Sequence, residues 1–365
     1  MKKVLMLTDH HVDMYNWRRE LICDLLDRGH EVHIALPYGE KVELLKQMGC
    51  IYTPISIERR GKNVVKDACL IRDYYALIKN YKPDVVLTYG TKPNIYGGIV
   101  CSILKTAYIE NINGLGTGIT TDTSFFEMFM QWLYKFSSKN AKCVFFQNSS
   151  DQRYCLGKKI VTSYNELLPG SGVNLEYFSA LPFPKGEPIV FTYIARIMKE
   201  KGIEEFLGAA KQLTVDYPGK AQFHILGFCE ESYEKQLEEL QNSGIVQYHG
   251  MQNDVRPYIM KSHCIVLPSF YGEGMSNTLL ESASSGRPII TTNLPGCGET
   301  LEDGVTGFVV EPRSTKSLIE TLKKFIEMSN DEQSAMGIAG RRKMELEFDR
   351  KIVVEKYLNR IEEEE

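Results

Sequence analysis

The sequence predicts an α/β protein made of two Rossmann-like domains. Its 365 residues exceed the size at which a single hydrophobic core usually stops growing. Short runs rich in Val, Ile and Leu alternate with longer helical patterns, which is typical of parallel βαβ units. The alternation stops once, at a segment with three prolines and one glycine (179–188), and then begins again. We therefore expect each half of the chain to hold its own parallel sheet.

These breaks define an N-terminal domain (1–178), a linker (179–188) and a C-terminal domain (189–345). A last helical stretch (346–365) follows, and the sequence leaves open whether it packs back across the hinge. The expected strands are 3–8, 31–36, 84–89, 107–111, 142–147, 189–194, 221–226, 245–248, 263–267 and 288–291. Helices are expected from about residue 16 to Gly29 and from about residue 64 to Pro83, because glycine and proline end helices. Ligands of open α/β sheets bind at the carboxyl ends of the strands, so we expect the two domains to face a central cleft.

Charge and cysteine content narrow the class of protein. The net charge is −4, with 22 Lys and Arg against 18 Asp and Glu in residues 1–180, and 21 against 29 afterwards. No basic footprint for nucleic acid is present overall, although the mildly basic first half suits an anionic partner. Nine cysteines occur without a Cys-x-x-Cys pair, which favours a reducing cytoplasm over a disulfide framework or a zinc site. No apolar run reaches the roughly 20 residues that cross a bilayer, so a membrane contact would be peripheral.

The segment 268–281 carries the most informative chemistry. It combines the end of a strand, a loop with two glycines around Glu273, and the first turns of a helix that Gly286 and Pro288 end. Ser276 or Asn277 is a suitable N-cap, so the following amides would point out of a helix N-terminus, where a diphosphate can bind. Glu281 lies eight residues after Glu273, about one turn inside the helix.

The Glu-x7-Glu spacing of Glu273 and Glu281 resembles the signature of retaining family 4 glycosyltransferases of the GT-B fold. The start of the second domain is similar to the Arg and Glu-Lys-Gly segment of the same family, with Arg196 and Lys201 in the matching positions. The segments 284–292 and 303–310 match the family pattern as well. The resemblance covers roughly residues 171–315.

The resemblance implies a role for each of these positions. Arg196 and Lys201 would hold the diphosphate of a nucleotide-sugar donor, Glu281 would bind the ribose hydroxyls, and Glu273 would approach the sugar. Transfer would retain the anomeric configuration, and the sequence offers no separate nucleophile. The remaining donor-binding positions implied by the family are Gly274, Met275, Ser276, Asn277, Thr278 and Leu279.

The same roles are chemically reasonable without the family. Departure of a nucleoside diphosphate develops negative charge, which fixed cations and helix-end amides stabilise as it forms. No Asp-x-Asp pair occurs, so we expect no metal and no cofactor besides the nucleotide sugar. The alternative is that Glu273 and Glu281 form a solvated helix edge, with Arg196 and Lys201 as ordinary surface charges.

The first domain departs from the family pattern. Many members carry a glycine pair in the first loop and a histidine after the strand that ends near Thr88, whereas this chain has neither. His10 or His11 is the candidate for the acceptor side. The segments 91–97 and 111–118 resemble a bacterial subgroup that adds a hexose or N-acetylhexosamine to glycans on undecaprenyl diphosphate, which favours a UDP-sugar donor. The other acceptor-side candidates are Lys92, Asn94, Asn113, Gly114 and Gly116.

Residues 124–136 contain six aromatic side chains, and Lys135, Lys139 and Lys142 lie in or just after this segment. Such a segment either packs in the core or rests in a lipid interface on the cytoplasmic face of the plasma membrane. Capsule and O-antigen synthesis are the pathways that the subgroup implies.

Three other functions are alternatives to glycosyl transfer. A dehydrogenase is disfavoured, because the 114–118 segment lacks the last glycine of the nucleotide fingerprint and lies far from the first strand. A non-hydrolysing nucleotide-sugar epimerase would use the same fold, and would release an epimerised sugar without an acceptor. A non-catalytic sugar- or lipid-binding module would not need the full set of Arg196, Lys201, Glu273 and Glu281.

Overall fold

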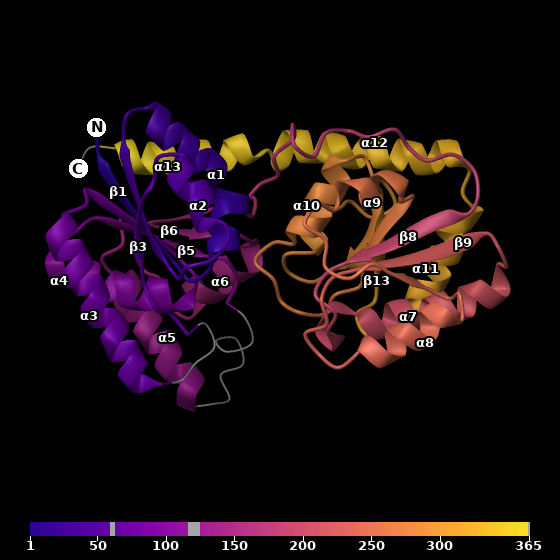
Figure 1. Ribbon diagram of the computed structural model, residues 1–365, viewed down its shortest axis with the longest axis horizontal. Helices are drawn as coiled ribbons and strands as arrows, with labels where there is room; N and C mark the ends of the chain where they lie inside the picture. Colours follow the sequence, from indigo (N-terminus) through magenta and orange to yellow (C-terminus); the bar gives the residue numbers. More distant parts are fainter. Residues whose placement is uncertain (59–62, 116–124, 364–365) are drawn as a thin grey trace. The chain divides into compact units, whose positions relative to one another are not determined.

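The computed structural model describes residues 1–58, 63–115 and 125–363, with residues 125–127 described by their backbone alone. The chain forms two compact units, each an α/β domain with a parallel sheet, as the sequence predicts (Figure 1). Unit 1 comprises Met1–Gly172 and Arg350–Glu365, and unit 2 comprises Val173–Asp349. The central cleft stays a prediction.

Unit 1 is built on a sheet with the order β3-β2-β1-β4-β5-β6-β7, in which every pair is parallel. Its strands are β1 (Lys3–Thr8), β2 (Glu31–Leu36), β3 (Ile51–Pro54), β4 (Val85–Tyr89), β5 (Tyr108–Ile112), β6 (Cys143–Phe146) and β7 (Asn165–Leu167). Its helices are α1 (His11–Asp27), α2 (Val42–Gln47), α3 (Val64–Tyr81), the π-helix η1 (Pro93–Gly97), α4 (Gly98–Leu104), α5 (Phe125–Ser138), α6 (Ser149–Gly157) and α13 (Arg350–Glu362).

Unit 2 has the strand order β10-β9-β8-β11-β12-β13, again all parallel. Its strands are β8 (Ile189–Ile194), β9 (Ala221–Leu226), β10 (Gln247–Tyr248), β11 (Cys264–Leu267), β12 (Ile289–Thr292) and β13 (Gly307–Val310). Its helices are the 3-10 turn η2 (Lys199–Lys201), α7 (Ile203–Asp216), α8 (Glu234–Asn242), α9 (Arg256–Lys261), α10 (Asn277–Ser284), the 3-10 turn η3 (Gly298–Thr300), α11 (Thr315–Glu327) and α12 (Asn330–Glu347).

The strand cores follow the hydrophobic pattern of the sequence. Residues on the central strands β1, β4, β8 and β11 are almost all buried, as expected for parallel strands covered by helices on both faces. All ten predicted strands are present to within about two residues, while β3, β7 and β13 were not predicted. All three are short; β3 and β7 are also not fully buried and carry a weak apolar pattern, whereas β13 is apolar and mostly buried.

The division of the chain differs in detail from the sequence-based boundaries. The proline-rich segment belongs to unit 2, where Arg287 donates to the carbonyl oxygens of Leu181 and Pro182 at 3.2 and 2.7 Å. Arg287 is fully buried and its burial lowers its pKa to about 10. Helix α13 belongs to unit 1, where it packs on α1 and contributes Val353, Tyr357 and Leu358 to a core of that unit.

Candidate functional site

The predicted donor residues of unit 2 lie where its strand order reverses. β8 and β11 are neighbours in the sheet, although β9 and β10 come between them in the sequence. Arg196 and Lys201 follow β8, and the 268–281 segment follows β11. This reversal is the usual ligand position of an open α/β sheet, because the loops that leave the two central strands diverge there.

Lys201 and Glu273, 72 residues apart, form an ion pair at this point. Their side chains are 8% and 17% exposed, so the pair is well shielded from water. The Lys201 ammonium also lies 5.4 Å from the centre of the Tyr271 ring. Glu273 therefore fixes the position of the cation that the sequence assigns to the diphosphate.

Backbone contacts hold Lys201 against the loop after β11. The amide of Phe270 donates to the Glu200 carbonyl at 2.8 Å, which ties η2 to this loop. Gly202 follows Lys201 with φ +77°, and a Cβ there would overlap the Pro268 carbonyl oxygen. Glycine is thus a geometric requirement at position 202, since only glycine allows both the left-handed turn and the close approach.

Arg196 occupies the other side of the β8 end. It is about one-third exposed, and its Nη1 lies 3.6 Å from Glu230 Oε2, with which it forms an ion pair. The Tyr193 hydroxyl donates to the Arg196 carbonyl at 3.1 Å. Burial, followed by the negative charge of Glu273, raises the pKa of Tyr193, which keeps this hydroxyl a neutral donor.

Helix α10 begins at the predicted place. Ser276 is its N-cap residue, but its side chain accepts no cap hydrogen bond, so the first amides of the helix lack this partner. Met275 and Leu279 are buried in the core, so any donor contact from them would come from the backbone. Asn277, Thr278 and Glu281 are half-buried. A helix N-terminus without a side-chain cap is a position at which an anion can bind.

Gly296 is a site residue that the sequence interpretation missed. It has φ +80°, and a Cβ at this position would lie 2.5 Å from the Glu273 carbonyl oxygen. Its own carbonyl accepts from the Ser276 amide at 2.8 Å, and its amide donates to Glu299 Oε2 at 2.8 Å. Gly296 thus supports the loop that carries Glu273. The Pro-Gly turn after β12 was the available signal.

A pocket next to the β10 end was also missed. It has a volume of 590 Å³ and is lined by His249, Met251, Gln252, Asn253, Asp254, Pro257, Tyr258 and Lys261. The His249 ring lies 4.8 Å from the Tyr258 ring at a tilt of 55°, and its Nε2 lies 3.2 Å from His224 Nδ1. Burial, followed by the charge of His249, lowers the pKa of His224 to about 4, which leaves it neutral near pH 7.

In unit 1 the two histidines lie at the corresponding reversal, between β1 and β4. His10 precedes α1, and its Nδ1 lies 3.0 Å from Asp13 Oδ1. The His11 ring stacks on His10 with centroids 5.2 Å apart, and it covers Gly39. Burial, followed by the neighbouring charge of His10, lowers the pKa of His11.

Lys92 and Asn94 are engaged inside unit 1. The Lys92 ammonium lies 2.5 Å from Asp67 Oδ1, and the Tyr96 hydroxyl donates to Asp67 Oδ2 at 2.9 Å. Asn94 is fully buried, accepts from Thr88 Oγ1 at 2.7 Å and donates to the Asn111 carbonyl at 2.9 Å. These bonds give both residues a structural role that the acceptor-side interpretation did not anticipate.

Asn113 and Gly114 lie just beyond β5. Asn113 Oδ1 accepts from Asn111 and, at 3.0 Å, from Gln147 Nε2, which in turn reaches Ser171 Oγ at 3.3 Å. Gly114 has φ +140°, and the next amide, of Leu115, donates to Asp151 Oδ2 at 3.3 Å. Gly116 lies outside the described residues. A polar network, rather than open amides, therefore occupies the described part of this segment.

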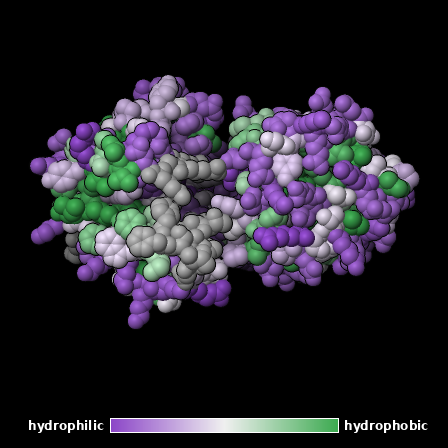
Figure 2. Space-filling model, turned by 90° about the horizontal axis from the view of Figure 1, so that it is seen from below, coloured by the Kyte–Doolittle hydropathy of each residue, from purple (hydrophilic) through white to green (hydrophobic). Residues whose placement is uncertain are grey.

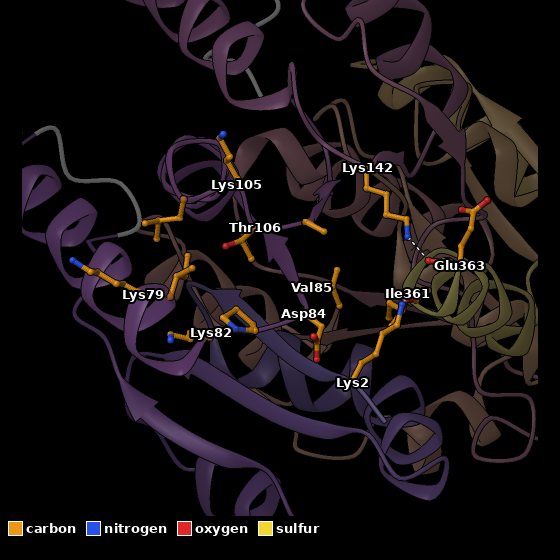
Figure 3. A pocket seen from close by; sticks show the side chains of 14 residues that line it. Lys2, Lys79, Lys82, Asp84, Val85, Lys105, Thr106, Lys142, Ile361 and Glu363 are labelled. Atoms are coloured by element: carbon orange, nitrogen blue, oxygen red, sulfur yellow. Dashed lines mark hydrogen bonds between the residues drawn. The ribbon is translucent and has the colours of Figure 1, made fainter. Parts of the chain in front are cut away.

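A second pocket lies at the opposite edge of the unit 1 sheet (Figure 3). It has a volume of 580 Å³ and is lined by Lys2, Asp84, Thr106 and Lys142, which come just before or at the starts of β1, β4, β5 and β6. Lys79, Lys82 and Lys105 add three more ammonium groups. Because it lies at the amino ends of the strands, it is separate from the predicted sites.

Known protein families and solved structures match both halves of the chain. Residues 3–148 match the family model "Glycosyl transferase 4-like", and residues 175–343 match "Glycosyl transferases group 1". The structure superimposes on a glycosyltransferase from Rickettsia africae with a TM-score of 0.81 at 17% identity, covering 100% of this chain and 99% of the other. Anabaena HepE in complex with UDP and glucose gives 0.79 at 14% identity, with both chains covered completely.

The chain therefore has the GT-B fold and is a glycosyltransferase. It belongs to the group 1 and family 4-like glycosyltransferases, as its Arg196, Lys201, Glu273 and Glu281 pattern indicated.

Two relatives have detailed names. The Campylobacter jejuni "N,N'-diacetylbacillosaminyl-diphospho-undecaprenol alpha-1,3-N-acetylgalactosaminyltransferase" is 25% identical, with 94% of each chain covered. The Escherichia coli "UDP-Gal:alpha-D-GlcNAc-diphosphoundecaprenol alpha-1,3-galactosyltransferase" is 26% identical over 72% of this chain and 71% of its own. Both names specify an acceptor sugar on undecaprenol diphosphate.

Proposed function

We propose that this protein transfers a hexose or N-acetylhexosamine from a UDP-sugar to a sugar carried on undecaprenyl diphosphate, with retention of configuration. The Lys201–Glu273 pair at the reversal point of unit 2 is the observation that carries the donor half. The names of the Campylobacter jejuni and Escherichia coli relatives support the acceptor part of the proposal. The similarity to Anabaena HepE with UDP is compatible with a UDP donor.

In this proposal, Arg196, Lys201 and the α10 amides neutralise the departing UDP. Fixed donors of this kind stabilise charge that develops in the transition state, because they need no reorganisation. Glu273 positions Lys201 and approaches the sugar, while Glu281 binds the ribose hydroxyls. Since the two cations supply the neutralising charge, we propose that the reaction needs no metal ion.

The acceptor side is proposed to be formed by unit 1, with His10, His11 and the Asn113–Gly114 segment closest to it. We propose that Lys92 and Asn94 support these loops instead of contacting the acceptor, since Asn94 is fully buried and Lys92 shares its partner Asp67 on α3 with Tyr96. Activity on a lipid-linked acceptor would place the protein at the cytoplasmic face of the plasma membrane, as a participant in capsule, O-antigen or glycoconjugate synthesis.

The test is transfer from a set of UDP-, GDP- and ADP-sugars to undecaprenyl-diphosphate-linked monosaccharides, followed by mass spectrometry. We expect one UDP-sugar to extend the acceptor by one residue. The anomeric coupling constant of the product should show the α configuration, and EDTA should leave the rate unchanged. A β-linked product would refute retention, and a metal requirement would refute the neutralisation by Arg196 and Lys201 alone. Release of an epimerised sugar without acceptor would identify an epimerase.

A further inference from the structure

Helix α5 is apolar on two opposite faces. Met130, Leu133 and Tyr134 pack into a core of unit 1. Met128, Phe129, Trp132 and Phe136, which share another face at helical spacing, are 59, 46, 58 and 50% exposed. The sequence allowed either core packing or a lipid interface for this segment, and the helix shows a packed face together with an uncovered one. The uncovered face therefore needs a physical explanation.

The uncovered side chains form a continuous aromatic surface. The Phe129 and Trp132 rings, and the Trp132 and Phe136 rings, lie 6.1 Å apart and nearly parallel. Figure 2 shows hydrophobic residues gathered on the part of unit 1 that carries α3 to α5. We call Met128, Phe129, Trp132 and Phe136 the aromatic face. An aromatic cluster of this kind is characteristic of residues that sit at the boundary between water and lipid.

Positive charge surrounds the C-terminal end of the same helix. The stretch 128–142 contains Lys135, Lys139 and Lys142 and no acidic residue. Ser138 Oγ donates to the Ile160 carbonyl at 3.2 Å, which places the exposed Lys159 next to this end of α5. Lys142 also lines the lysine-rich pocket at the amino edge of the sheet, where its ammonium donates to the Glu363 carbonyl at 2.7 Å (Figure 3).

We propose that the aromatic face and the lysines at its end form a docking surface for an anionic phospholipid bilayer. α5 would lie in the plane of the interface, with the aromatic rings among the upper acyl chains and the ammonium groups at the phosphates. The biological role of this surface rests on the proposed function, because an acceptor on undecaprenyl diphosphate is reached only at a membrane. Its evidence, however, is independent of the catalytic site.

Charge selects the bilayer over a second copy of this chain. A second copy would present the same aromatic face and the same lysines, with no carboxylate in residues 128–142 to pair with them, so it offers no complementary charge. An anionic bilayer presents the opposite charge to every one of these lysines. The charge and the aromatic rings therefore favour the same partner.

Tryptophan fluorescence tests the insertion directly, because the chain has two tryptophans, Trp17 and Trp132. In the full-length W17F variant, Trp132 is the only tryptophan, so excitation selective for tryptophan reports on it alone. Adding phosphatidylglycerol-containing vesicles should shift its emission to the blue, and brominated acyl chains should quench it. Unchanged emission at every lipid composition, with W132 still exposed to iodide, would overturn the docking surface.

Vesicle flotation tests the two parts of the surface. We expect binding to phosphatidylcholine–phosphatidylglycerol vesicles and much weaker binding to phosphatidylcholine alone. F129S/W132S should lower partitioning at least about tenfold, since it removes most of the inserted area. K135Q and K139Q should each lower it about fivefold, and added salt should have the same effect.

Matched controls are available in unit 2. I338S/L346S removes two side chains that are each 67% exposed, and K235Q/K316Q removes two lysines that are 90 and 86% exposed. Neither control should change flotation, and an equal loss in the controls would overturn the proposal. If F129S/W132S changed the mass in light scattering without any vesicle binding, the face would be a contact between copies, which also overturns it.

A water-soluble short-chain acceptor separates this proposal from the proposed function. With that acceptor, F129S/W132S should transfer sugar at the wild-type rate, while transfer to acceptor in vesicles falls. Failure to transfer to any acceptor, with vesicle binding intact, would refute the function and leave the surface standing. Equal loss of transfer to both acceptors would show that α5 acts on the catalytic site and not on the membrane.

Discussion

The two units share a strand order but use the point of reversal differently. In unit 2, an ion pair and the start of α10 lie on loops that glycines and backbone hydrogen bonds hold in place. In unit 1, Lys92 is already bonded to Asp67 and Asn94 is buried. Each reversal point holds a lysine–carboxylate pair, so the comparison teaches that such a pair alone does not mark a ligand site: in unit 2 it lies on loops next to the start of α10, whereas in unit 1 the neighbouring Asn94 is buried and bonded inside the unit.

The largest effect is expected from Lys201→Ala, because this change removes a shielded cation from the unit 2 reversal point. Turnover should fall by roughly 10²- to 10³-fold, as for the loss of a preorganised donor at developing negative charge. The measurement is kcat with saturating donor, alongside circular dichroism. Lys199→Ala, with a side chain that is 61% exposed, is the matched control and should keep nearly full activity. Equal activity of both variants would contradict a role of Lys201 in catalysis, and with it the functional difference between Lys201 of unit 2 and Lys92 of unit 1.

A second effect concerns a buried carboxyl group of unit 1. Glu110 on β5 is fully buried, neither oxygen has a hydrogen-bonding partner at normal distance among the described residues, and the Ser137 hydroxyl donates to the Tyr134 carbonyl. Burial raises the pKa of Glu110 to about 8, and nearby Ser137 offsets only part of the rise. Because the folded state favours the neutral acid, stability should fall as the pH rises from about 4.5 to about 8.

Glu110→Gln should therefore stabilise the protein by about 2 kcal/mol at pH 7 and flatten this part of the pH profile, since an amide does not ionise. Urea unfolding between pH 5 and pH 8 measures the effect. Glu58→Gln is a suitable control, because it replaces a carboxylate that is 43% exposed by the same amide. A parallel loss of stability with pH in wild type and Glu110→Gln would contradict the assignment.

The third effect tests whether the backbone positions the Glu273 loop. In Gly296→Ala the new Cβ would lie 2.5 Å from the Glu273 carbonyl oxygen, so the loop must move. A displacement of this kind at a catalytic loop should lower kcat by about tenfold or more. Gly244→Ala is the matched control, because Gly244 also has positive φ (+71°) but meets no atom within 4 Å. Gly244→Ala should lose about 1 kcal/mol of stability from its backbone angle alone, Gly296→Ala should lose more because of the added overlap, and only Gly296→Ala should lose turnover.

These residues also show which parts of the fold and of the candidate site could be predicted from the sequence. Hydrophobic alternation predicted the two sheets, and the Arg196, Lys201, Glu273 and Glu281 spacing predicted the family, while the roles of these residues toward a donor stay predictions. Gly296 was missed because its function is a through-space contact with a loop 23 residues earlier, which no local pattern records. The bonding of Asn94 was missed for the same reason, because its partners Thr88 and Asn111 lie on different strands.

The smallest effect is expected at Lys92. Its side chain is 12% exposed and paired with Asp67, which is 19% exposed and also accepts from Tyr96. Lys92→Ala should lower the free energy of unfolding by about 1 kcal/mol, because a partly shielded carboxylate loses one of its two partners. The acceptor KM should stay the same, and Lys66→Ala, whose side chain is 59% exposed, should change neither quantity. If Lys92→Ala instead raised the acceptor KM severalfold at unchanged stability, the Lys92 ammonium would leave Asp67 to bind an acceptor phosphate. Both units would then present a cation at the point where their strand order reverses.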